Sequence, residues 1–219
     1  MAKIIIFGTQ DIAQLANYYF TSDSKHEVVA FAVNEKYLKI KEFEGKPVVA
    51  FETITETYPP SAYMMFVAMS YKNLNKLRTE KYLEAKAKGY QLVSYVSSAC
   101  TFLSSFDVGD NSLILENNTI QPYVKIGSNV IIWSGNHIGH HSVIDDHSFI
   151  SSHVVISGRC HIKSGCFLGV NSTIANNIVI EKNCIIGSGA VITAGTEEDA
   201  VYVPPKTVKL NKKSFEINL

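Results

Sequence analysis

Six of the seven histidines in this sequence lie between residues 137 and 161, and this cluster is where its side chains could do the most chemistry. An imidazole can bind a metal ion, transfer a proton near neutral pH, or simply be a surface side chain. The choice depends on how the chain arranges the cluster in space. Its members are His137, His140, His141, His147, His153 and His161.

A six-residue repeat predicts that arrangement. Every sixth residue from Val108 to Ile192 is Val, Ile or Leu, fifteen positions in succession, and such a fixed period is typical of a solenoid. The residue four positions later is small or apolar in most repeats, so two side chains per repeat point inward. Three repeats make one triangular coil, so we expect about five coils, stacked about 4.8 Å apart as parallel strands. This pattern describes a left-handed parallel β-helix built of hexapeptide repeats.

The repeat argues against a metal site. Two ligands from one chain would have to lie on neighbouring coils, 18 or 36 residues apart, or at one corner, and no two of the clustered histidines have that spacing. Cys160, Cys166 and Cys184 fall on inward positions, where a thiol serves as a small apolar group. We therefore expect no metal. For most of these histidines, the ordinary interpretation is that they are surface side chains with no functional role.

The first 98 residues follow a different pattern, in which apolar strands alternate with helices. Such alternation predicts a small, mostly parallel α/β sheet. We expect residues 1–98 to form this domain and residues 99–219 to form the β-helix with a C-terminal tail. The expected strands are Lys3–Phe7, Glu27–Val33, Tyr63–Met69 and Tyr90–Val96, and the expected helices are Asp11–Phe20 and Lys72–Lys88.

Composition excludes several classes of function. The 219 residues carry 20 Lys+Arg against 20 Asp+Glu, and this balance lacks the basic excess that nucleic-acid binding usually requires. No apolar stretch approaches the roughly 20 residues of a membrane span, and the opening MAKIIIFG reads as a first strand rather than a signal peptide. We expect a cytoplasmic protein with no nucleic-acid or membrane partner.

The segment Ile132–Gly158, IWSGNHIGHHSVIDDHSFISSHVVISG, resembles the active-site stretch of bacterial nucleotide-sugar acetyltransferases, often called sialic-acid O-acetyltransferase-like. That family joins a small N-terminal Rossmann-like domain to a C-terminal left-handed β-helix, so the resemblance covers nearly the whole chain. It implies an acetyl-CoA-dependent N-acetyltransferase acting on a nucleotide-linked amino-deoxysugar. It also implies a homotrimer with acetyl-CoA between subunits, for which Tyr123 and Trp133 are candidate interface residues.

The resemblance assigns the site residues of the β-helix. His140 matches the family's catalytic base, and His141 stands where the family usually has a carboxylate that orients the base. Gly158 matches the glycine whose backbone lies near the thioester, and it follows His140 by 18 residues, one full coil. The resemblance therefore implies that His140 is a general base and that backbone N–H groups near Gly158 hold the oxyanion. The other expected acetyl-CoA contacts are Phe149, where some relatives have a histidine, Val170 and Ser188.

The N-terminal domain is expected to bind the nucleotide sugar. Gly8, Thr9 and Gln10 follow the first strand and precede a helix, where a Rossmann-like fold holds phosphates, although the G-x-G-x-x-G pattern is absent. Asn34 stands where relatives have an aspartate near the base of the nucleotide. Ser70 and Asn73 follow the third strand and complete the expected contacts.

Two alternatives to N-acetylation stay open at this point. O-acetylation of a sugar hydroxyl requires stronger deprotonation, so the histidine in place of a carboxylate at residue 141 would be more costly. A non-catalytic protein that binds a nucleotide sugar is the alternative from another class.

Overall fold

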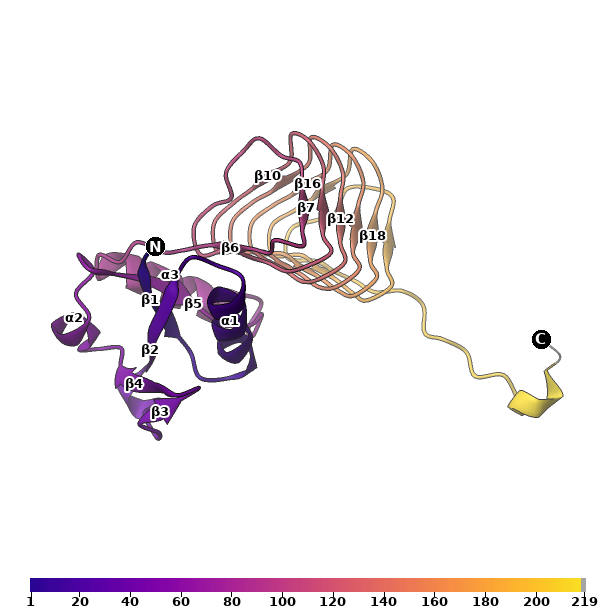
Figure 1. Ribbon diagram of the computed structural model, residues 1–219. Coiled ribbons are helices and arrows are strands. Elements are labelled where there is room, and N and C mark those ends of the chain that lie inside the picture. Colours follow the sequence, from indigo (N-terminus) through magenta and orange to yellow (C-terminus); the bar gives the residue numbers. More distant parts are fainter. Residues whose placement is uncertain (218–219) are drawn as a thin grey trace.

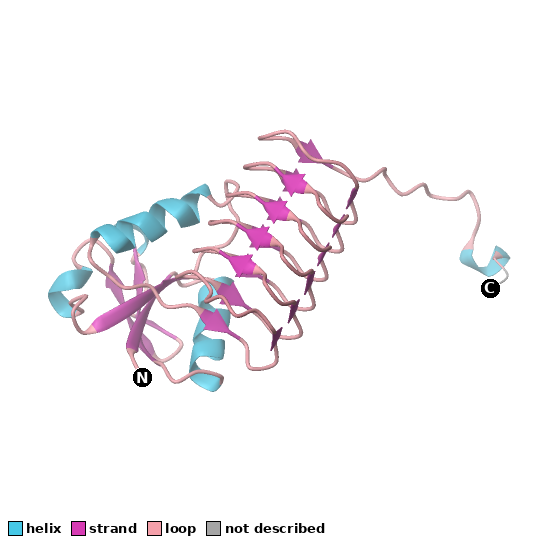
Figure 2. Ribbon diagram, turned by 90° about the horizontal axis from the view of Figure 1, so that it is seen from above, coloured by secondary structure: helices cyan, strands magenta, loops and turns pink. Residues whose placement is uncertain are grey.

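The computed structural model describes residues 1–217 and consists of an α/β part followed by a β-helix (Figure 1). The last residues leave the final coil as an extended tail that ends in the short 3₁₀ helix η2 (Ser214–Glu216), well away from the rest of the molecule (Figures 1 and 2). No helix described between residues 1 and 217 is long and apolar enough to cross a membrane.

The N-terminal part contains a five-stranded sheet in the order β3-β4-β2-β1-β5, parallel except for the short β3–β4 pair. Its central strands are buried on both faces, as in parallel sheets that helices cover. The strands are β1 (Lys3–Phe7), β2 (Glu27–Val33), β3 (Glu42–Phe43), β4 (Lys46–Ala50) and β5 (Tyr63–Val67); the helices are α1 (Asp11–Ser22), η1 (Glu35–Tyr37), α2 (Ile54–Thr57) and α3 (Lys76–Ala87).

Several details of this part differ from the prediction. The pattern missed η1, β3, β4 and α2, which are short, and β5 ends at Val67 rather than at Met69. Helix α3 begins at Lys76 rather than at residue 72, because Asn73, Leu74 and Asn75 all have positive φ, which ends any helix. The segment 90–96 does not form the predicted strand of the N-terminal sheet. Leu92 makes only an isolated bridge to that sheet, and Tyr95 and Val96 pair with the β-helix instead.

The β-helix consists of three parallel sheets whose strands pair with strands 18 residues away. A seven-stranded sheet contains β6 (Tyr95–Val96), β8 (Leu113–Ile114), β11 (Ile131–Ile132), β14 (Phe149–Ile150), β17 (Phe167–Leu168), β20 (Ile185–Ile186) and β22 (Val201–Tyr202). A six-stranded sheet contains β7 (Thr101–Phe102), β9 (Thr119–Ile120), β12 (His137–Ile138), β15 (Val155–Ile156), β18 (Thr173–Ile174) and β21 (Val191–Ile192). A four-stranded sheet contains β10 (Lys125–Ile126), β13 (Val143–Ile144), β16 (His161–Ile162) and β19 (Val179–Ile180).

The interior confirms the register read from the repeat. The fourteen repeat residues from Ile114 to Ile192 are at most 7% exposed, and Val108 packs against them at the start of the stack. Cys160, Cys166 and Cys184 are buried among them as unpaired thiols, as predicted. The β-helix is therefore held together by a continuous column of stacked aliphatic side chains.

The corners explain where several histidines lie. One residue at nearly every corner has positive φ, and asparagine and histidine adopt this left-handed conformation more readily than most residues. His141, His147 and His153 occupy such positions, as do several asparagines. For His147 and His153, backbone geometry alone accounts for the residue type.

The N-terminal part covers the seven-stranded sheet. Outward side chains of this sheet, among them Leu113, Ile131 and Phe149, share one buried cluster with Phe20 and Phe66 of the N-terminal part. Trp133 packs against the same cluster and is only partly buried. Tyr123, by contrast, is 56% exposed.

Two buried polar side chains fasten α3 to the β-helix. The Arg78 guanidinium is fully buried and donates to the backbone oxygens of Asn129, His147 and Ser148 at 2.9–3.2 Å. Burial lowers the pKa of Arg78 to about 9. One turn earlier, the Asn75 amide donates to the backbone oxygens of Gly165 and Cys166, each at 3.1 Å.

Candidate active site

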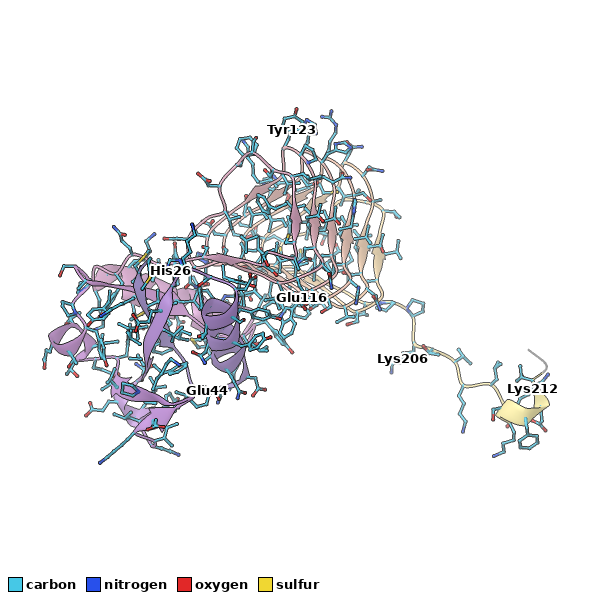
Figure 3. The ribbon with its side chains drawn as sticks, viewed as in Figure 1. His26, Glu44, Glu116, Tyr123, Lys206 and Lys212 are labelled. Atoms are coloured by element: carbon cyan, nitrogen blue, oxygen red, sulfur yellow. The ribbon has the colours of Figure 1, made fainter. Side chains whose placement is uncertain are left out.

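The predicted base lies on the corner between the six- and four-stranded sheets, which we call the histidine corner. It comprises residues 121–123, 139–141, 157–159 and 175–177 on successive coils. Tyr123 marks this corner at the top of the β-helix in Figure 3, on the side away from the N-terminal part. The placement follows from topology, because this corner is opposite the covered seven-stranded sheet.

His140 and Gly158 stack on consecutive coils, as the 18-residue spacing predicts. The imidazole lies against Gly158 so closely that a Cβ on this residue would come within 2.8 Å of His140 Nε2. One coil earlier, Gln121 Oε1 accepts the backbone N–H of His140 at 2.8 Å. Nε2, the nitrogen that would accept a proton, therefore faces the glycine.

His141 contacts His140 through the other ring nitrogen. The two Nδ1 atoms are 3.0 Å apart, so one ring donates a hydrogen bond and the other accepts it. The His141 ring packs on Tyr123 with centroids 4.6 Å apart. In this arrangement His141 lies directly beside His140, the predicted base.

The Gly158 N–H is engaged rather than available as a donor. It donates to Asn176 Oδ1 at 2.9 Å. Asn176 lies one coil after Gly158 on the same corner and was missed by the sequence reasoning, although its spacing of 36 residues from His140 would have identified it. The expected oxyanion donor therefore already has a partner.

The expected acetyl-CoA contacts are not brought together. Phe149 is 2% exposed and packs between Tyr71 and Phe167 under the N-terminal part, so its assignment to acetyl-CoA is wrong. Phe149 is buried because it points outward from the seven-stranded sheet, which the N-terminal part covers, and its ring fills the core between the two parts. Val170 and Ser188 are exposed and stack one coil apart, but on the corner between the seven- and six-stranded sheets rather than on the histidine corner.

The expected nucleotide-sugar contacts lie along the carboxyl edge of the N-terminal sheet. Gly8 has a φ of 124° and packs on the Ala68 carbonyl, where a Cβ would come within 2.8 Å, so this tight turn requires glycine. Thr9, Gln10, Asn34, Ser70 and Asn73 all follow the carboxyl ends of the adjacent strands β1, β2 and β5.

A carboxylate at this edge was not predicted. Glu52, just beyond β4, accepts the Asn34 side-chain amide and the Glu35 backbone N–H, each at 2.8 Å. Partial burial opposes ionisation, but these hydrogen bonds outweigh it and hold the pKa of Glu52 below its usual value. Glu52 thus places a carboxylate directly beside Asn34.

Two other histidines of the cluster, His147 and His161, have separate partners. His147 Nδ1 pairs with the Asn129 amide at 3.0 Å, and burial lowers its pKa. His161 Nε2 lies 2.9 Å from Asp145 Oδ2. Over residues 1–217, no group of three or more His, Cys, Asp or Glu side chains is placed to hold a metal ion.

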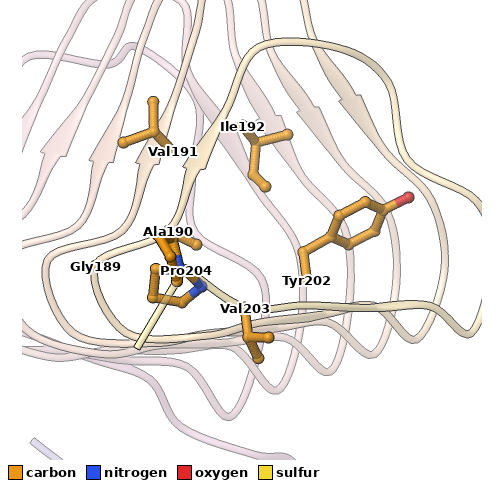
Figure 4. Close-up of a pocket in the computed structure, with 8 residues that line it drawn as sticks. Gly189, Ala190, Val191, Ile192, Tyr202, Val203 and Pro204 are labelled. Atoms are coloured by element: carbon orange, nitrogen blue, oxygen red, sulfur yellow. The ribbon is translucent and has the colours of Figure 1, made fainter. Parts of the chain in front are cut away.

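Two shallow hollows lie away from the histidine corner. One, of about 330 Å³, is at the open end of the β-helix, where the root of the tail meets the last coil (Figure 4). Its lining, which includes Val191, Ile192 and Tyr202, is mostly apolar. The other, of about 250 Å³, lies beside α3 and includes His147 and Lys76. His140 lines neither.

The comparisons with known proteins agree with this fold. Residues 107–140, 123–158 and 159–194 match the family described as bacterial transferase hexapeptide (six repeats). No curated protein sequence matches. Residues 107–194 therefore consist of bacterial transferase hexapeptide repeats, and their stacked parallel sheets form the left-handed β-helix of that family.

Solved structures share the architecture over nearly the whole chain. A histidine-to-asparagine variant of perosamine N-acetyltransferase from Caulobacter crescentus, in complex with CoA and GDP-perosamine, has a TM-score of 0.80 at 19% identity and covers 92% of this chain and 93% of its own. The acetyltransferase domain of PglB from Neisseria gonorrhoeae has a TM-score of 0.77 at 16% identity, covering 92% and 96%. WeeI from Acinetobacter baumannii has a TM-score of 0.75 at 21% identity, covering 92% and 96%. This chain shares the fold of these bacterial proteins, and its residues 107–194 match hexapeptide repeats.

Proposed function

We propose that this protein is an acetyl-CoA-dependent N-acetyltransferase whose substrate is the amino group of a nucleotide-linked amino-deoxysugar. The observation that carries the proposal is the stacking of His140 Nε2 on Gly158 at an exposed corner of the β-helix. The imidazole lies directly against the glycine, and the exposed His140 side chain can be reached by a thioester and an attacking amine. The similar structures whose titles name CoA, acetyl coenzyme A or GDP-perosamine supply the substrate classes.

In this proposal His140 takes the proton from the sugar amine as the nitrogen attacks the thioester carbonyl. His141 Nδ1 pairs with His140 Nδ1 and orients the ring so that Nε2 faces the reacting atoms. An amine requires less help from a base than a hydroxyl does. An imidazole in place of a carboxylate at residue 141 therefore favours N-acetylation over O-acetylation.

The α/β part serves in this proposal as the Rossmann-like domain that holds the nucleotide. Its carboxyl edge offers the Gly8 turn, the N-terminus of α1, and the Asn34–Glu52 pair. Phosphates bind well at helix N-termini, and a carboxylate can accept hydrogen bonds from ribose or base. The predicted boundary at residue 98 and the cytoplasmic location belong to the same proposal.

A trimer completes the site. Within one chain the histidine corner is opposite the sheet that the N-terminal part covers, so the sugar-binding edge and His140 are on different sides of the β-helix. A second copy would bring its own carboxyl edge to the histidine corner of the first. Acetyl-CoA would then lie in the cleft between two protomers.

The test is a screen for release of free CoA thiol. Purified protein is mixed with acetyl-CoA and a panel of nucleotide-linked amino sugars, each paired with the matching sugar that carries a hydroxyl in place of the amine. We expect thiol release with at least one amino sugar, none with its hydroxyl counterpart, and an acetylated product by mass spectrometry. Release with the hydroxyl series alone would establish O-acetylation, and no release with either series would refute the proposed function.

A further inference from the structure

We propose that the side-chain amide of Asn176 stabilises the oxyanion of the acyl transfer, in place of the Gly158 backbone N–H. This inference rests on the proposed acyltransferase function and assigns a further catalytic residue to it. Asn176 lies on the histidine corner, one coil after Gly158 and two coils after His140. It is exposed and so can reach a bound thioester.

The hydrogen bond to Gly158 determines what Asn176 can offer. Oδ1 accepts the Gly158 N–H at 2.9 Å, so the oxygen of the amide faces the backbone. An asparagine amide has its two donors on Nδ2, and among the described residues no protein group accepts from them. Asn176 therefore blocks the backbone donor and presents its own N–H groups instead.

The same glycine brings the donor and the base together. His140 Nε2 packs on the Cα side of Gly158, and Asn176 holds the N–H of Gly158 from the next coil. Gly158 itself is buried beneath the imidazole, so a thioester carbonyl at the exposed side between His140 and Asn176 would meet the base and the amide at once. Side-chain amides of asparagine are established oxyanion donors in other acyl transfers.

The reaction then balances as follows. The amine nitrogen attacks the carbonyl carbon, the C–N bond forms, and the C=O electron pair moves to the oxygen, which accepts a hydrogen bond from Asn176 Nδ2. The proton of the amine passes to His140 Nε2. The C=O bond reforms, the C–S bond breaks, and the departing CoA thiolate takes the proton from His140.

Asn176→Asp is the discriminating variant. Its carboxylate keeps an oxygen for the Gly158 N–H but has no donor, so we expect kcat to fall by about 10²–10³, the usual effect of losing one oxyanion donor, with the KM for acetyl-CoA nearly unchanged. Asn177→Asp is the matched control. It adds the same charge to the adjacent exposed corner residue, whose side chain has no role in the proposal, and it should retain kcat within about twofold.

Asn176→Ala separates the two possible donors. Alanine removes the amide and releases the Gly158 N–H, so a backbone oxyanion donor would leave this variant as active as the wild type or more active. The proposal predicts instead a loss of kcat similar to that of Asn176→Asp, with an unchanged melting temperature. Full activity of Asn176→Ala or of Asn176→Asp would overturn the Asn176 assignment while leaving the proposed function intact. An inactive wild-type protein would refute the proposed function itself.

Discussion

At the residue scale, the two adjacent histidines of the histidine corner have different roles in the proposal, and substitution separates them. His140→Ala removes the base and should lower kcat by about 10²–10⁴ with little change in KM. His141→Ala removes only the partner of the His140 Nδ1 atom, so its effect should be smaller. Steady-state kinetics on folded variants test this order. A larger loss from His141→Ala would assign the base to His141.

His141→Glu extends this test to the pH profile. A carboxylate restores the group that the resembled family places beside the base, and it should maintain or raise kcat. Because a negative neighbour favours the protonated imidazole, the acid limb of the profile should move to higher pH. A purely structural role for His141 would leave that limb in place, which makes the pH profile more informative than the rate alone.

Gly158→Ala tests whether the close approach of His140 matters. A Cβ would lie 2.8 Å from His140 Nε2 and would push the ring aside, and a base displaced by about 1 Å can lose about 10² in kcat. The backbone of Gly158 has no positive φ, so the melting temperature should hardly change. Gly195→Ala is the control, since its Cβ would make only an ordinary contact of 3.6 Å. Equal activity of both variants would contradict the proposed site.

Sequence spacing located some of these residues and not others. His140 and Gly158 share a corner because each coil has 18 residues, and this arithmetic holds for any residue in the repeat. The same arithmetic would have pointed to Asn176, which was missed, and the orientation of its amide depends on a hydrogen bond that no spacing contains. Phe149 was misassigned because the repeat shows which side chains point outward but not which outward face another domain covers.

At the scale of elements, the β-helix depends on its stacked interior. Ile156 is fully buried, and Ile156→Asp would place a carboxylate where no partner exists, at a cost of several kcal/mol. We expect a large drop in melting temperature or failure to fold. Val155→Asp on the same strand is the control, because Val155 points outward and is 38% exposed. Similar melting temperatures for the two variants would show that the inward register is wrong.

Substitution of Arg78 tests how α3 is attached to the β-helix. Arg78→Met removes a buried guanidinium that donates to three backbone carbonyls of the β-helix. Each carbonyl left buried and unpaired would lower the free energy of unfolding by up to about 1–3 kcal/mol. We expect earlier unfolding in urea. Trp133, the only tryptophan, packs against the interdomain cluster, so its fluorescence reports loosening there. Lys76→Met on the exposed side of α3 should leave the transition unchanged; an equal shift would contradict the role of Arg78.

The elements themselves were predicted unevenly. A period of six sustained over fifteen repeats is a global signal, and β1 and β2 were found at their observed bounds because each is a continuous apolar run. The start of α3 was missed because Asn73, Leu74 and Asn75 are in the left-handed conformation, so the helix cannot begin before Lys76. In the same segment, the Asn75 side chain donates to the backbone of Gly165, 90 residues away, a contact that no local sequence pattern shows.

At the scale of the whole molecule, the arrangement of the two parts predicts how copies of the chain assemble. The N-terminal part covers one of the three β-helix sheets, and the histidine corner joins the other two. We therefore expect a homotrimer in which each site combines His140 of one protomer with the carboxyl edge of a neighbour. Sedimentation should give three times the monomer mass at micromolar concentration. A stable monomer with full activity would contradict this arrangement.

Mixing two inactive variants tests the sharing of the site directly. His140→Ala lacks the base, and Gly8→Ala distorts the sugar-binding turn, where φ is 124° and a Cβ meets the Ala68 carbonyl. Each variant alone should fold and be inactive. If a site takes one group from each of two protomers, co-refolded trimers in a 1:1 mixture should recover about a quarter of wild-type activity, because both contributors are intact at one interface in four. If each site were built within one chain, every protomer in the mixture would still carry a defect, and no activity would return.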